Sequence, residues 1–124
     1  MRGRIGRRIF IIAIVCLGLV VVYVRMSWRR FDARVWQDAV ISARSPYPRR
    51  QMADDLLRRG LLKGLTADSL VRLLGPKPKT DYFASWDFVY WLGPERGFIS
   101  IDSEWLVVDL GTDGKVARAE IVTD

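Results

Sequence analysis

The sequence predicts an α+β protein: an N-terminal transmembrane helix followed by a two-layer ααβββ domain with an antiparallel three-stranded meander. Three observations lead to this fold class. An uncharged apolar run lies near the N-terminus, and two short amphipathic segments with helix-capping residues come after it. Beyond residue 80, the apolar spacing changes from about four residues to two, over three segments separated by turn residues.

The composition excludes several kinds of site. The 124 residues contain no histidine and one cysteine, which excludes a histidine general base, a Ser/His/Asp triad, an internal disulfide and the usual zinc sites. The net charge is +6, but residues 1–30 hold seven arginines and no acid, while the other 13 basic residues are balanced by all 14 acidic ones. Because the excess charge brackets the apolar run, it indicates membrane topology and no nucleic-acid partner.

The apolar run at residues 9–24 predicts a membrane anchor. Extending the run to Trp28 gives a helix of about 30 Å, which matches the hydrocarbon core of a bilayer. The alternative is a cleaved signal peptide, but no Ala-x-Ala site follows the run. A lipidated cysteine is not expected either, because Val15 precedes Cys16 where a lipobox needs a small residue. The predicted anchor contacts the lipid bilayer through residues that include Ile9, Phe10, Val15, Leu19, Val24 and Trp28.

This anchor, residues 9–28, divides the rest of the chain into three parts. Residues 1–8 are expected to form a basic tail, residues 29–45 a stalk, and residues 46–124 the folded domain. Positive charge is slightly greater before the anchor than after it, which favours a cytoplasmic N-terminus. We therefore expect a single-pass protein of the cell membrane, with its domain outside the cytoplasm in the periplasm.

Helices and strands are predicted in order from capping residues and periodicity. A helix is expected over Pro48–Arg59, with proline in its first turn and Gly60 beyond its end. A second is expected over Ala67–Leu74, between Thr66 as N-cap and Gly75-Pro76 as terminator. Alternating apolar residues predict strands at 86–92, 105–110 and 116–122, with both helices on one face of the sheet.

The segment from Asp109 to Gly114 has two interpretations. With Glu120 it matches several positions of an EF-hand calcium loop, but Gly111 offers no side-chain oxygen at the third position. The flanking residues are β-branched and aromatic, and Asp113-Gly114 is a strong hairpin signal. The hairpin is therefore preferred, and neither a metal nor any other cofactor is predicted.

The chain resembles a known group over about Arg49–Asp124. The segments MADDLLRRGLLKGLTADSLVRLLGPKP, YWLG and DSEWLVVDLGTDGKVARAEIVTD are similar to the SmpA/OmlA (BamE-like) family of small bacterial envelope proteins. The motif that carries the resemblance most specifically is LLGPKP at Leu73–Pro78, which ends a helix pair. The resemblance implies a helix pair before a three-stranded sheet, and a role as an interaction platform in envelope or outer-membrane assembly.

The predicted function is that of a protein-interaction module, and no enzymatic activity is expected. No nucleophile, metal-ligand set or phosphate loop accompanies the carboxylates. An accessory or regulatory subunit of a larger inner-membrane complex and a small-ligand-binding domain are the alternatives. Binding would use the sheet face that the helices leave open and the loop at 93–97, to another envelope protein. The candidate interaction residues are Trp91, Tyr90, Arg96, Arg49 and Arg50.

Overall fold

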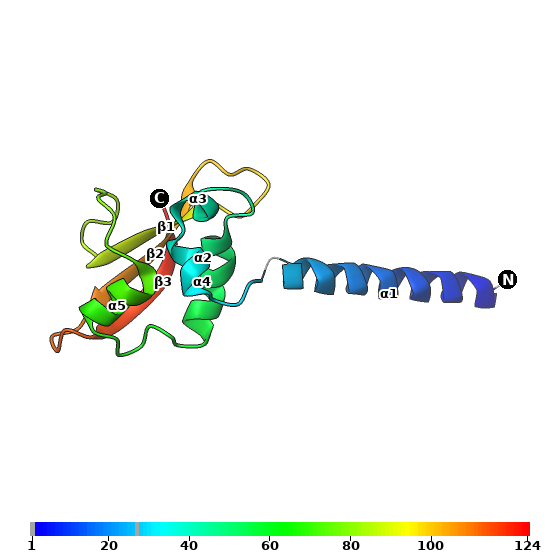
Figure 1. Cartoon of the computed structure of the whole chain (residues 1–124). Coiled ribbons are helices and arrows are strands. Elements are labelled where there is room, and N and C mark those ends of the chain that lie inside the picture. Colours follow the sequence, from blue (N-terminus) through cyan, green and yellow to red (C-terminus); the bar gives the residue numbers. More distant parts are fainter. Residues whose placement is uncertain (1, 27) are drawn as a thin grey trace.

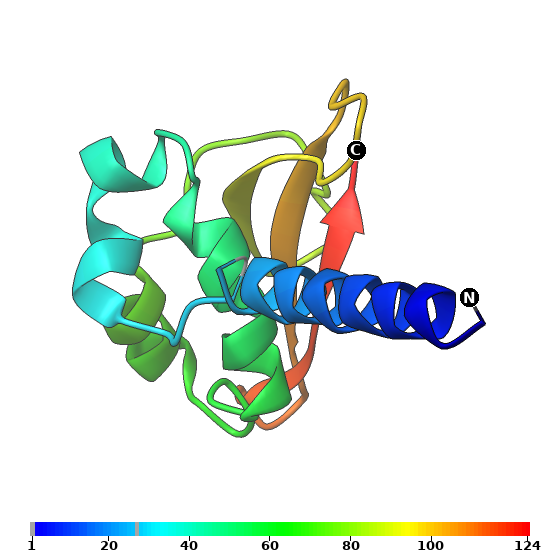
Figure 2. The same ribbon diagram turned by 90° about the vertical axis from the view of Figure 1, so that its right-hand side faces the viewer.

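The structure, a computed structural model, describes residues 2–26 and 28–124 and is an α+β fold with an antiparallel three-stranded sheet. Met1, in the expected basic tail, and Ser27, in the expected anchor, lie outside the described residues. Helix α1 projects away from a domain in which helices form one layer and the sheet the other (Figures 1 and 2). The elements are α1 (Arg2–Met26), α2 (Ala33–Gln37), α3 (Ala39–Ser42), α4 (Pro48–Arg58), α5 (Ala67–Leu74), β1 (Phe88–Pro94), β2 (Ser103–Leu110) and β3 (Val116–Thr123).

Helix α1 is long and apolar enough to cross a membrane over Gly3–Val24, a stretch of 22 residues. The helix begins at Arg2, so the expected basic tail is its first two turns and not a separate segment. The predicted anchor residues Ile9, Phe10, Val15, Leu19 and Val24 are all exposed along it. Trp28 was expected inside the anchor, but it follows the helix and its ring packs 3.5 Å beneath the Arg58 guanidinium.

Residues 29–45 do not form the predicted stalk, because the short helices α2 and α3 within this segment pack on the domain. The side chain of Trp36 is fully buried in the core that the helices share with the sheet. Asp32 and Asp38 accept hydrogen bonds from backbone N–H groups at the starts of α2 and α3, which explains two such short helices. The folded unit therefore includes the chain from about Phe31 onward.

Helices α4 and α5 lie close to where their capping residues predict. Helix α5 has the predicted bounds, with the Thr66 hydroxyl accepting a hydrogen bond from Ser69 N–H at 3.2 Å. Helix α4 ends at Arg58, one residue before the prediction. Both helices bury their apolar stripes against the same face of the sheet; the fully buried side chains are those of Met52, Ala53, Leu56 and Leu70.

The sheet has the order β1-β2-β3, which confirms the predicted meander. Strand β1 starts at Phe88, not at Trp86, because Trp86 N–H donates to the Phe83 carbonyl and closes a turn just before the strand. Side chains that face the helices, such as Tyr90 and Leu106, form the main core. Those on the opposite face form a second, smaller cluster around Trp105.

The turn between β2 and β3 is the predicted hairpin. Gly111 N–H donates to the Lys115 carbonyl at 2.7 Å, and the Asp113 carboxylate accepts from Lys115 N–H at 3.1 Å. Asp109, the first residue of the alternative calcium loop, instead pairs with Arg118 across the two strands at 2.7 Å.

Candidate protein-interaction surface

Tyr90 cannot contribute to an interaction surface, contrary to the prediction. Its side chain is 1% exposed and its hydroxyl donates to the Gly75 carbonyl at 2.9 Å. Burial raises the pKa of this hydroxyl to about 12. The alternation of β1 turns Tyr90 toward the helix layer, so the residue joins α5 to the sheet.

Trp91 lies on the opposite face of β1, as predicted, but this face is not open. The segment before β1 crosses it and packs on the Trp105 cluster: Tyr82 stacks on Trp105 with ring centroids 5.2 Å apart, and Phe83 meets the same ring edge-on at 6.2 Å. Trp91 is half-buried between this cluster and Tyr47, whose ring it contacts edge-on at 5.9 Å. Aromatic packing therefore already occupies most of this face.

Arg49 and Arg50 both bind backbone carbonyls of their own domain. The Arg49 Nε donates to the Trp36 carbonyl at 2.7 Å, and its guanidinium lies 5.4 Å from the Trp36 ring centre. Burial lowers the pKa of Arg49 below its ordinary value. Arg50 donates to the carbonyl of Pro94, at the end of β1. Both arginines thus fasten α4 to neighbouring segments.

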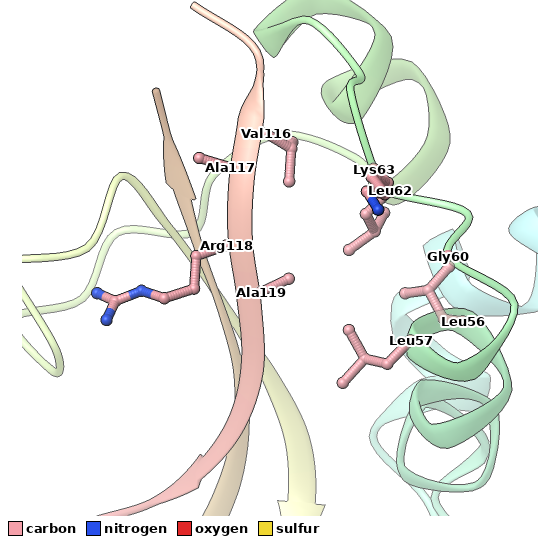
Figure 3. Close-up of a pocket in the computed structure, with 9 residues that line it drawn as sticks. All are labelled: Leu56, Leu57, Gly60, Leu62, Lys63, Val116, Ala117, Arg118 and Ala119. Atoms are coloured by element: carbon pink, nitrogen blue, oxygen red, sulfur yellow. The ribbon is translucent and has the colours of Figure 1, made fainter. Parts of the chain in front are cut away.

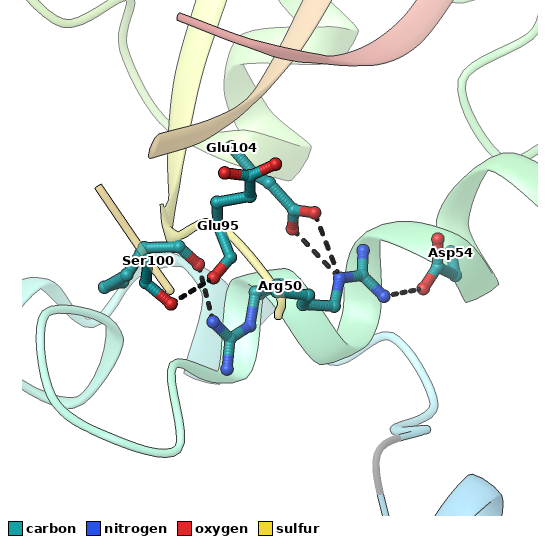
Figure 4. Close-up of polar contacts among 7 residues, drawn as sticks. Arg50, Asp54, Glu95, Ser100 and Glu104 are labelled. Atoms are coloured by element: carbon teal, nitrogen blue, oxygen red, sulfur yellow. Dashed lines mark hydrogen bonds and ion pairs between the residues drawn. The ribbon is translucent and has the colours of Figure 1, made fainter. Parts of the chain in front are cut away.

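Arg96 holds the base of the β1–β2 loop (residues 95–102). Its guanidinium bonds Asp54 of α4 at 2.6 Å and Glu104 of β2 at 2.9 Å. Figure 4 shows Asp54 and Glu104 converging on this position, next to Arg50. The structure therefore brings Arg50 and Arg96 together at one end of the sheet, while Arg49 lies with Trp36 on the other side of α4.

The outer edge of β3 offers unpaired backbone groups. Asp124 N–H bonds the Ser103 carbonyl, and the alternation of an antiparallel ladder then directs the N–H and C=O groups of Ala119, Ile121 and Thr123 away from β2. At the start of the strand, Val116 is already paired with Gly64 and Leu65 through two backbone bonds. Within residues 28–124, the backbone groups of Ala119 and Ile121 that point outward have no hydrogen-bond partner.

An apolar groove runs beside this edge (Figure 3). It lies between the C-terminal half of α4, the segment after it and β3, and has a volume of about 180 Å³. Its walls are aliphatic, and Lys63 adds positive charge at the rim. The Arg118 side chain points away from the groove and pairs with Asp109 (Figure 3). Such a groove can bury apolar side chains, and no carboxylate, hydroxyl or thiol lines it. It is lined by Leu56, Leu57, Gly60, Leu62, Lys63, Val116, Ala117, Arg118 and Ala119.

The groove was not predicted from the sequence. The alternation in VARAEIVT indicates which β3 side chains face the helices, but does not reveal that β3 is an edge strand or that α4 stands beside it. One signal was available: the small residue Ala119 leaves room where a larger side chain would fill the groove (Figure 3). In the described residues 2–26 and 28–124, no group of three metal-ligating side chains comes together.

Comparison with known proteins gives no relative. No family model matches the chain, and neither the curated proteins nor the solved structures contain a significant match. The assignment of a function therefore rests on the residues and geometry described above.

Proposed function

We propose that this chain is a membrane-anchored interaction module of the cell envelope, with α1 as the anchor and the domain as the binding unit. The domain binds an extended segment of another envelope protein, which adds to β3 as a fourth strand. The domain lies on the periplasmic side, and the proposed role is that of an assembly factor like those of the SmpA/OmlA (BamE-like) family. This proposal is supported by the resemblance of residues 49–124 and by the arrangement of β3.

The observation that carries the proposal is the free edge of β3 beside an apolar groove. A free strand edge is a template for pairing with another chain, and soluble domains usually protect such edges. Within residues 28–124, backbone bonds protect this edge at Val116 alone, through the segment at 64–65. Added strands gain affinity from main-chain hydrogen bonds and specificity from pockets that take alternate side chains. The outward backbone groups of Ala119 supply the main-chain hydrogen bonds, and the groove beside them supplies the pocket for a side chain.

The size of the groove favours a peptide over a free small ligand. Pockets for small molecules usually measure about 300–1,000 Å³, whereas this groove measures about 180 Å³. That volume suits one or two aliphatic side chains. Lys63 at the rim favours an acidic residue next to it in the partner segment.

Strand addition can be tested by proline substitution at the edge. In Ala119→Pro the outward N–H is removed, while the ladder to β2 uses the neighbouring residues and persists. Ala119→Ser is the matched control, because it keeps the N–H and the small size. A photoreactive residue at the exposed Ala117 reports a bound partner in native membranes. We expect a protein adduct that persists in Ala119→Ser and is lost in Ala119→Pro.

Two results would contradict strand addition. One is an adduct of equal yield in Ala119→Pro and Ala119→Ser, when equal melting temperatures show that both variants are folded. The other is the absence of any protein adduct at Ala117. The anchor is tested separately by carbonate washing of membranes: the full chain should stay in the pellet with an intact N-terminus, and a mature N-terminus beyond residue 25 would show a cleaved signal instead.

A further inference from the structure

The β1–β2 loop carries an exposed apolar tip, defined as Phe98, Ile99 and Ile101. These side chains are 104%, 68% and 84% exposed, respectively. Three large apolar side chains that touch almost nothing in their own domain cost solubility and contribute nothing to the core. The tip therefore needs an environment that the domain itself does not provide.

The base of this loop is held firmly, unlike its tip. Arg96 joins the loop to Asp54 and Glu104, and Arg50 binds the Pro94 carbonyl (Figure 4). Within the loop, Glu95 N–H donates to the Asp102 carbonyl at 2.9 Å, and the Ser100 hydroxyl donates to the Glu95 carbonyl at 2.6 Å. These contacts fix the direction of the tip, so its exposure is a defined feature of the fold.

The loop lies on the side of the domain from which α1 departs. In Figure 1 the loop, in yellow to orange, and α1 share one side, while the β2–β3 turn is on the opposite side. Figure 2, seen from the α1 side, shows no other segment in front of the tip. A shallow cavity of about 230 Å³ brings Tyr23, in the last turn of α1, next to Arg50, Gln51 and Arg96.

We infer that the apolar tip inserts into the interface of the same bilayer that α1 crosses, as a second membrane contact that orients the domain. This inference rests on the proposed anchoring by α1. Aromatic and aliphatic side chains flanked by arginine are the chemistry that binds a lipid interface. The arginines on this side complement anionic headgroups, since Arg29 and Arg30 are exposed and Arg58 packs on Trp28.

Insertion also fits the proposed binding of a partner at β3. The groove between α4 and β3 shares no lining residue with the tip or with the cavity beside Tyr23, so it can be filled while the tip is inserted. The loop fixes how far the domain can tilt, so that a partner segment meets the β3 edge in one orientation. Glu95 and Asp102 lie at the loop base, at the depth of the headgroups and not among the acyl chains.

Fluorescence quenching in vesicles tests the inference with the full chain. Cys16→Ala removes the native thiol, and Ile99→Cys carries an environment-sensitive NBD label between Phe98 and Ile101. The matched control is Thr112→Cys on the β2–β3 turn. The vesicles contain phosphatidylcholine and phosphatidylglycerol, with a nitroxide either on the acyl chains or absent. At position 99 we expect blue-shifted emission, quenching by the lipid nitroxide and protection from aqueous iodide, and at position 112 the reverse.

A second variant separates the tip from the label. Phe98→Ser combined with Ile101→Ser should return the label at position 99 to water, because the label alone does not hold the loop in the bilayer. Equal iodide quenching at positions 99 and 112 in chains that float with the vesicles would overturn the inference. Protection that disappears on dilution of protein in lipid would assign the tip to a second copy and would equally overturn it. Chains that fail to float would instead show that the anchor, and with it the proposed function, is wrong.

Discussion

The two connections of the sheet differ although both join antiparallel neighbours. The β2–β3 turn is short and polar, and its Asp113 carboxylate closes it on Lys115 N–H. The β1–β2 loop is longer, its base is held by arginines, and its tip exposes Phe98 and Ile101. Reversing the chain requires only the first design. The apolar tip of the β1–β2 loop is therefore explained by what surrounds the loop and not by the need to reverse the chain. Of the two connections, the β1–β2 loop is the one on the same side as α1 (Figure 1).

Under the proposed membrane contact, the two ends of one small sheet lie in two media. Its far end, at the β2–β3 turn, has the composition of a surface in water. Its near end combines apolar side chains with arginines, as expected beside a bilayer. Between the two ends, the outward backbone groups of Ala119 and Ile121 are unpaired in the described residues, and the proposal assigns them to a protein segment.

The comparison assumes that both ends of the sheet belong to one folded unit that includes Trp36. Substitution of Trp36 tests this assumption and should give the largest loss of stability. Trp36→Ala removes a fully buried ring that contacts Phe31 and Tyr90, and should lower the free energy of unfolding by about 3–5 kcal/mol. Urea unfolding of the full chain in detergent, followed by near-UV circular dichroism, measures this loss. Trp36→Phe is the control and should cost less, because it keeps an aromatic ring and removes an indole N–H that has no hydrogen-bond partner. A loss of unfolding free energy below about 1 kcal/mol in Trp36→Ala would show that residues 29–45 are a stalk outside the folded unit, as the sequence predicts.

Substitution of Asp55 should give the next largest loss of stability. This residue of α4 binds the segment that follows α1. Its buried carboxylate accepts from Phe31 N–H at 2.8 Å and pairs with Arg59 and Arg58. The Phe31 N–H, then the two guanidinium groups, lower the pKa of Asp55 below its ordinary 3.8, although burial opposes the shift. Asp55→Asn should cost about 1–3 kcal/mol at neutral pH.

The pH dependence of this cost follows from the lowered pKa. The stabilising contribution of Asp55 is fully present above the pKa of the unfolded chain and is lost as the pH falls through the lower pKa of the folded state. The stability gap between wild type and Asp55→Asn should therefore narrow below about pH 4. Asp54→Asn, at a half-exposed ion pair with Arg96, is the control and should cost less than about 1 kcal/mol. A gap that stays constant down to pH 2 would contradict this role of Asp55.

At the β2–β3 turn, Gly114→Ala should reduce stability without any change in lipid contact. Gly114 has a φ of 73°, and a Cβ in this left-handed conformation costs about 1–2 kcal/mol even though open space surrounds it. Thermal melting measures the loss, and the NBD label at position 99 serves as the second readout. A change in lipid quenching together with the melting temperature would show that the two ends of the sheet are coupled.

Phe98→Ser is expected to have the smallest effect on stability. At the loop tip we expect the reverse of Gly114→Ala: lipid contact changes and stability does not. Because the ring is 104% exposed, stability in detergent should stay within about 0.5 kcal/mol of wild type. Quenching of the label at position 99 by lipid nitroxides should nevertheless fall. A clear drop in melting temperature would mean that the tip packs on the domain in solution.

The parts of the fold that depend on local signals could be predicted. Helix α5 has the predicted bounds because Thr66 and Gly75 act within one turn of the ends they define. The hairpin at Gly111–Lys115 likewise follows from its Asp-Gly pair. Trp36 could not be predicted in the core, since its burial comes from contacts with Tyr90, more than 50 residues away, and the local sequence resembles a solvated helix.

The binding surface was predicted less well than the fold, for a related reason. Alternation along β1 correctly separates Trp91 from Tyr90, but the sequence does not show that Tyr82 and Phe83 return to cover the face of Trp91. It likewise does not show which strand is left at the edge. The apolar residues at 98–101 can be seen in the sequence, but the sequence does not show that they lie on the α1 side of the domain. That position is what suggests a contact with the membrane.

Amide hydrogen exchange of the unmodified full chain tests the central claim most directly, because one measurement reports on all three regions. It is made in native membranes and after purification into vesicles. We predict slow exchange for residues 97–101 in both preparations, and fast exchange for residues 112–114 in both. The outward amides of Ala119 and Ile121 should exchange slowly only in native membranes, where the partner is present. Equal exchange at the loop and the turn in vesicles, or amides at Ala119 and Ile121 that exchange alike in both preparations, would contradict the account.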